Sequence, residues 1–81
     1  MLKVNLTSGY CNPPLIRTIE CEEVVTYTKK HTISMYNLTK KGKRKLIAYA
    51  CFEDWLQIEI VYDNGEREII YKKDSYLWIR K

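Results

Sequence analysis

The chain has 81 residues, enough for one domain, and its hydrophobic content of 46% with 12% aromatic residues excludes a disordered segment. So short a chain buries only about 60% of its unfolded surface, which leaves little room for the deep cleft of an enzyme. The formal net charge is +4, and the stretch 29–45 holds seven Lys and Arg residues without an acid. This uneven charge points to a charged partner.

Membrane spans and secretion signals are not visible in the sequence. The longest apolar run, residues 46–52, is far shorter than the roughly 20 residues of a membrane helix. The N-terminus lacks a basic start, a long apolar region and a small-residue cleavage site. The chain has an odd number of cysteines, Cys11, Cys21 and Cys51, and no CxxC pair. This pattern favours reduced thiols over disulfides. We therefore expect an intracellular, cytoplasmic protein without membrane contact.

The sequence of the first half of the chain predicts extended strands. Residues 2–8 alternate apolar and polar side chains and predict a strand, which ends at Gly9 and the following Asn-Pro-Pro sequence. Residues 15–28 are rich in β-branched side chains and lack helix caps, so they predict another strand, with a bulge near Glu22 and Glu23. Lys29 and Lys30 then turn the chain.

Two further strands follow around the basic turn. Residues 31–38 predict a strand with Ile33 and Met35 on one face and Tyr36 and Leu38 on the other. Residues 45–52 are apolar on both faces, which is typical of a central strand. The same stretch also fits a period of 3.6, so a helix near residues 43–55 remains an alternative.

The last predicted hairpin surrounds Asn64-Gly65, a pair that favours a two-residue type I′ turn. Such a turn pairs Asp63 with Glu66, Ile60 with Ile69, and Ile58 with Tyr71. The tail from residue 76 to 81 predicts one more short strand. The fold expected is all-β: a small antiparallel meander of about six strands, curled into a barrel-like or strongly bent sheet. The alternative is an α+β fold with the one helix near residues 43–55.

The sequence contains no motif for catalysis or metal binding. His31 is the only histidine, no nucleophile motif surrounds it, and the three cysteines lack the paired spacing of a zinc site. The three glycines are far apart and form no phosphate-binding loop. We therefore expect no enzyme activity, no catalytic residue, no metal and no cofactor.

The residue types that remain indicate binding. Basic and aromatic side chains are the candidate binding residues for a protein or a nucleic acid, and three acids form a candidate acidic patch. The candidate binding residues are Lys40, Lys41, Lys43, Arg44, Lys45, Tyr36, Tyr49, Trp55 and Trp78. The candidate acidic patch consists of Glu20, Glu22 and Glu23.

Two functions fit these residues. The preferred hypothesis is a small protein-binding module, monomeric or homodimeric, that docks on another protein and adapts or inhibits it. Its size and composition are compatible with a phage or mobile-element inhibitor of a host nuclease or defence system. The alternative is a small nucleic-acid-binding β-barrel that uses the basic turn of residues 40–45.

Overall fold

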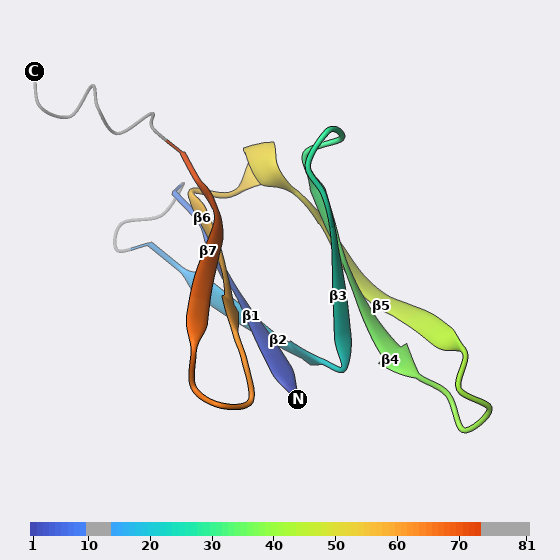
Figure 1. Ribbon diagram of the computed structural model, residues 1–81. Coiled ribbons are helices and arrows are strands. Elements are labelled where there is room, and N and C mark those ends of the chain that lie inside the picture. The colour runs from blue at the N-terminus through green and yellow to red at the C-terminus, as the bar shows by residue number, and fades with distance from the viewer. Residues whose placement is uncertain (10–13, 74–81) are drawn as a thin grey trace, which may run out of the picture.

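The computed structural model describes residues 1–9 and 14–73, and these residues form two antiparallel sheets (Figure 1). The elements are β1 (Leu2–Thr7), β2 (Ile16–Cys21), β3 (Glu23–Tyr27), β4 (Thr32–Leu38), β5 (Arg44–Cys51), the 3-10 helix η1 (Phe52–Asp54), β6 (Gln57–Val61) and β7 (Arg67–Lys72). The all-β expectation is confirmed, and the alternative helix near residues 43–55 shrinks to the single turn η1. No helix in the described ranges has the length and apolar character to cross a membrane.

The strand order differs from a simple meander. The four-stranded sheet has the order β2-β1-β6-β7, and the three-stranded sheet has the order β3-β4-β5. The predicted single strand over residues 15–28 is wrong, because the chain leaves one sheet at Cys21 and enters the other at Glu23. The described strands form no closed barrel.

The core lies between the inner faces of the two sheets. Its buried members are Val4, Leu6, Cys21, Ile33, Met35, Ala50, Phe52, Ile58 and Ile60. The predicted inward face of β4 is confirmed, because Ile33 and Met35 are fully buried while Tyr36 and Leu38 are not. Alternation along β1 and β6 therefore turns one face of the four-stranded sheet toward the core.

The β6–β7 hairpin departs from its predicted register. Gly65 (φ +88°) has left-handed backbone whereas Asn64 does not, so the turn is a three-residue loop, Asp63 to Gly65, and not type I′. A register shift between Ile58 and Glu59 then restores the predicted pairing of Ile58 with Tyr71. Ile60 lies opposite Glu68, not Ile69, and Ile69 is 52% exposed.

The predicted position of the strand at residues 45–52 also needs correction. β5 is a strand, but it lies at the edge of its sheet and pairs only with β4 among the described residues. Its burial pattern is exposed over the first four residues. The two apolar residues among these four, Leu46 and Ile47, lie outside the core because the β4–β5 hairpin reaches away from the four-stranded sheet (Figure 1).

Candidate functional site

The outer face of the three-stranded sheet carries three tyrosines, and we call it the tyrosine face: Tyr27, Tyr36 and Tyr49. Residues directly opposite one another in an antiparallel sheet share a face. The register pairs Tyr27 with Thr32 and Tyr49 with Ser34, and β4 places Tyr36 two residues beyond Ser34. Thr32 and Ser34 are buried, to 7% and 5% exposure, although they lie on this outer face. We infer that their larger neighbours cover them.

Polar contacts fix part of the tyrosine face. The guanidinium carbon of Arg44 lies 4.9 Å from the centroid of the Tyr36 ring, a cation–π geometry. Arg44 Nη1 also donates to Glu23 Oε1 at 3.1 Å. The pKa of Tyr27 is raised, mainly because its side chain forms a hydrogen bond with Tyr36. Two tyrosines and one arginine are therefore held together as one cluster.

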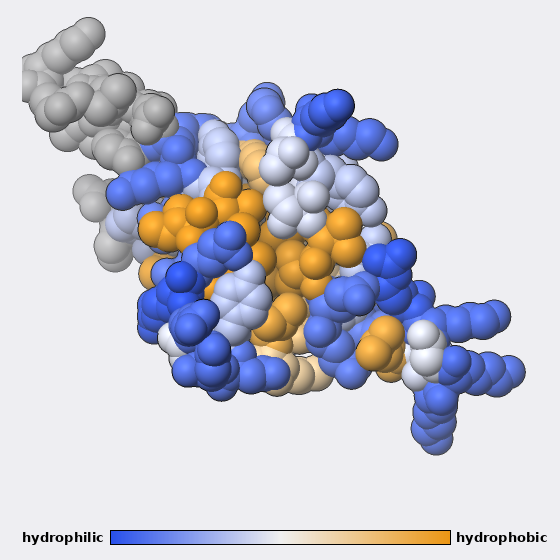
Figure 2. All heavy atoms as spheres, viewed as in Figure 1, coloured by the Kyte–Doolittle hydropathy of each residue, from blue (hydrophilic) through white to orange (hydrophobic). Residues whose placement is uncertain are grey.

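Apolar side chains extend this face along the hairpin. A bulge in β5 places two consecutive apolar residues, Leu46 and Ile47, beside the single Tyr36 of β4. Of the nine large hydrophobic side chains that are exposed in the described part of the chain, five belong to this sheet. They are Tyr27, Leu38, Leu46, Ile47 and Tyr49. Figure 2 shows apolar side chains close to basic ones toward the end of this hairpin.

The basic turn joins β4 to β5 at the tip of the hairpin. Its loop closes through Gly42, whose φ is +78° and whose N–H donates to the Thr39 carbonyl at 2.9 Å. Four of its lysines, Lys40, Lys41, Lys43 and Lys45, are exposed. Within the described ranges none of these four has an acid within ion-pair distance. The turn therefore places four charges beside the apolar part of the tyrosine face.

The second basic pair lies elsewhere. Lys29 and Lys30 belong to the turn between β3 and β4, at the opposite end of β4 from Lys40. The prediction that the two clusters occupy different turns is confirmed. The basic residues therefore form no continuous stripe along β4.

The structure separates Trp55 from the tyrosine face. Trp55 follows η1, at the end of β5 opposite the basic turn, and packs half-buried against the core. Trp78 lies outside the described residues. Among the described residues, Tyr36 and Tyr49 are the predicted aromatic residues that share a hairpin with the basic turn.

The three predicted acids have separate environments. Glu20 lies on β2 opposite Lys3, in the other sheet. The Glu22 carboxylate accepts the Leu38 N–H at 2.9 Å, and Glu23 pairs with Arg44. Two of these acids therefore bind groups of the protein itself.

Sequence reasoning did not single out Tyr27, Leu38, Leu46 and Ile47, which the structure places on or beside the tyrosine face. The alternation of side chains along residues 31–38 put Leu38 on the same face as Tyr36, so it could have identified Leu38 from the sequence. The other residues needed the pairing of three strands and the bulge in β5, which the sequence does not display.

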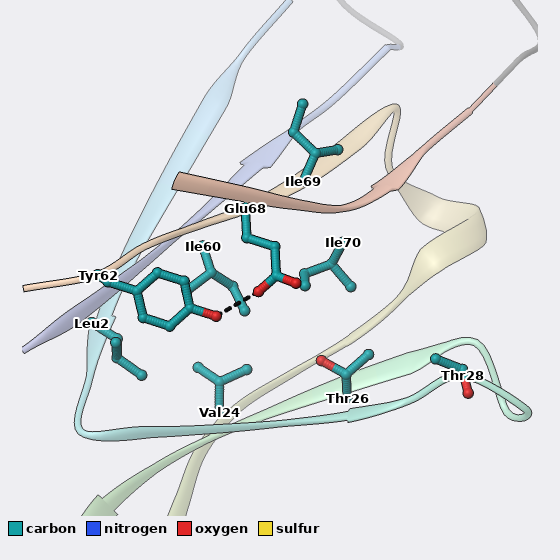
Figure 3. A pocket seen from close by; sticks show the side chains of 9 residues that line it. All are labelled: Leu2, Val24, Thr26, Thr28, Ile60, Tyr62, Glu68, Ile69 and Ile70. Carbon is teal, nitrogen blue, oxygen red and sulfur yellow. Dashed lines mark hydrogen bonds between the residues drawn. The ribbon is translucent and has the colours of Figure 1, made fainter. Parts of the chain in front are cut away.

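A cleft of about 440 Å³ opens between the two sheets (Figure 3). Apolar side chains such as Val24, Ile60 and Ile70 line it, and the Tyr62 hydroxyl donates to Glu68 Oε1 at 2.5 Å. This hydrogen bond raises the pKa of Tyr62. The register shift turns Glu68 toward this cleft, whereas Glu59 lies opposite Ile69, so the two carboxylates do not share the face expected from a regular hairpin.

The remaining chemistry of the described residues is sparse. Cys21 and Cys51 are free thiols, and burial raises the pKa of Cys21. No three His, Cys, Asp or Glu side chains within 1–9 and 14–73 come together as a metal site. No protein-family model matches the chain, and no curated protein or solved structure shows significant similarity to it.

Proposed function

We propose that this protein is a small, non-enzymatic binding module that docks on another protein through the tyrosine face. The observation that carries the proposal is the gathering of five exposed apolar side chains on one small sheet. Contiguous exposed apolar groups rimmed by charge are typical of protein–protein interfaces. Tyrosine and arginine also dominate the binding energy of such surfaces, and Arg44 lies against Tyr36.

The charges around this face define the kind of partner. Four exposed lysines lie at one end of the apolar surface, so the matching partner surface is apolar at its centre and acidic at its rim. Lysines at a rim increase the rate of association more than the final affinity. Inhibition of an enzyme with an acidic surface, such as a host nuclease or defence protein, is the role that we assign to this docking.

A comparison of matched variants in a pull-down from host lysate tests the proposal. The wild type should retain a specific protein, and the double variant Leu46→Ala/Tyr49→Ala should lose it, because both side chains are more than half exposed on the tyrosine face. The control is Leu15→Ala/Ile16→Ala, since these side chains are similarly exposed and lie at the start of β2 in the other sheet. Equal capture by all three proteins would refute docking through the tyrosine face.

Nucleic-acid binding is the second candidate, because Tyr36 and Tyr49 share one hairpin with the basic turn. Stacked aromatic rings beside lysines are typical of proteins that bind single strands. Fluorescence anisotropy with labelled DNA and RNA at about 50 and about 200 mM salt separates the two candidates, since phosphate contacts weaken steeply with salt. Our first proposal predicts no binding that collapses between these salt concentrations. Micromolar binding that does collapse would favour the nucleic-acid candidate.

A further inference from the structure

β5 presents a long unpaired edge. It has eight residues, which makes it the longest of the described strands, and only its β4 side is paired among the residues that the structure describes. An exposed edge offers backbone N–H and C=O groups to any second strand. Lysines and bulges commonly protect an edge strand from such pairing. β5 has both, but only in its first half. The second half, from Ala48 to Cys51, is free of bulges and charge.

The hydrogen-bond pattern shows which groups of this half point outward. The Phe52 N–H donates to the His31 carbonyl at 2.8 Å, so positions 31 and 52 form a hydrogen-bonded pair. Pairs alternate along an antiparallel ladder, so Ala50 bonds toward β4 and Tyr49 and Cys51 do not. The N–H and C=O of Tyr49 and Cys51 therefore point away from the sheet.

The distribution of charge along β5 indicates which second strand fits this edge. Lys43, Arg44 and Lys45 lie at the start of β5, while Glu53 and Asp54 follow its end. Two copies of β5 that pair antiparallel bring the basic start of each beside the acidic end of the other. We propose that the protein forms a homodimer in which the two β5 strands pair antiparallel about a two-fold axis at Tyr49.

A two-fold axis at Tyr49 gives the outward backbone groups hydrogen-bond partners and also brings opposite charges together. Tyr49 of each copy exchanges its outward N–H and C=O with Tyr49 of the other, and Cys51 pairs with Ile47. The same pairing brings Lys45, near the start of β5 in one copy, close to Glu53 and Asp54 of the other copy, which lie in η1 directly after β5. Each pair occurs twice, because the two-fold axis repeats every contact.

This dimer does not depend on the proposed docking function. Edge pairing with the axis perpendicular to the sheet joins two three-stranded sheets into one of six strands. Both tyrosine faces then lie on the same side of that sheet and remain open to a partner. Loss of dimerisation and loss of partner capture are separate measurements.

Charge reversal tests the proposed register. Sedimentation velocity is measured from about 1 μM to about 1 mM, a range that covers weak and tight association. We expect Lys45→Glu to raise the dimer dissociation constant about tenfold, since it converts two attractive contacts into repulsive ones. Adding Glu53→Lys should restore dimerisation. Within one copy Lys45 lies near the start of this eight-residue strand of about 26 Å and Glu53 lies beyond its end, so rescue must come from contact between copies.

Two variants at position 49 test the backbone contact. Tyr49→Ala and Tyr49→Pro both remove the ring, but only proline removes the outward N–H. We expect the alanine variant to dimerise and the proline variant to be monomeric, with circular dichroism spectra that show both folded. Proline is tolerated here because this N–H does not bond to β4. A wild type that stays monomeric at all concentrations, or charge reversal without rescue, would overturn the proposal.

Discussion

Glu22 lies at the point where the chain leaves the four-stranded sheet and enters the three-stranded one. Its N–H donates to the Tyr36 carbonyl at 3.0 Å and to Asn37 Oδ1 at 3.1 Å. Its carboxylate accepts the Leu38 N–H at 2.9 Å. One exposed residue thus attaches the crossover to the end of β4, next to the basic turn.

Replacement of Glu22 should therefore destabilise the protein. We expect Glu22→Ala to cost about 1 kcal/mol, the usual net value of one hydrogen bond, because the Leu38 N–H loses its acceptor. Glu22→Gln should cost less, since its amide oxygen still accepts. Urea unfolding measures the change, with Glu20→Ala as the control, for which a surface change within about 0.5 kcal/mol is expected. Equal midpoints for Glu22→Ala and Glu20→Ala would contradict this role.

At the scale of elements, the two long hairpins share one turn design. Each has a three-residue loop that ends in a glycine with positive φ, Gly42 (+78°) or Gly65 (+88°). The sequence predicted the existence and place of both turns, because glycine between apolar runs is a strong local signal. It did not predict the loop length at Asn64-Gly65, since that pair also suits a two-residue turn that would change the register by one residue.

The register of the β6–β7 hairpin can be tested with two isoleucines. A regular two-residue turn would place Ile60 and Ile69 opposite each other in the core, whereas the structure gives exposures of 4% and 52%. We expect Ile60→Ala to cost about 2–5 kcal/mol and Ile69→Ala less than about 0.5 kcal/mol. Denaturant midpoints of the two variants provide the comparison. Similar losses for both would support the regular register.

Prediction of the tyrosine face from the sequence was limited, because it depends on how three strands pair. Tyr36, Tyr49 and the basic turn were identified because each residue type suggests binding by itself. The position of Trp55 relative to them was left open, since whether an aromatic residue packs in the core or reaches solvent depends on tertiary contacts. Leu46 and Ile47 read as a buried central strand, because an apolar run looks the same at an edge as at a centre.

At the scale of the whole molecule, two small sheets share a single core. β4 contributes Ile33 and Met35 from one side, and β6 contributes Ile58 and Ile60 from the other. The chain crosses between the sheets at Glu22 and again after β5. A three-stranded sheet has too little apolar surface of its own to remain folded when this core is lost.

The shared core predicts that both sheets unfold together. Met35→Ala should cost about 2–5 kcal/mol, because Met35 is fully buried at the contact between the sheets. Amide NMR signals from β1 and from β3 should then fade at the same, lower urea concentration, since a small domain of this kind unfolds in one step. The matched control is Leu38→Ala, on the outer side of the same strand, which should leave the midpoint nearly unchanged. Loss of the β3 signals while those of β1 persist would show instead that the three-stranded sheet, with its tyrosine face, is a separately stable unit.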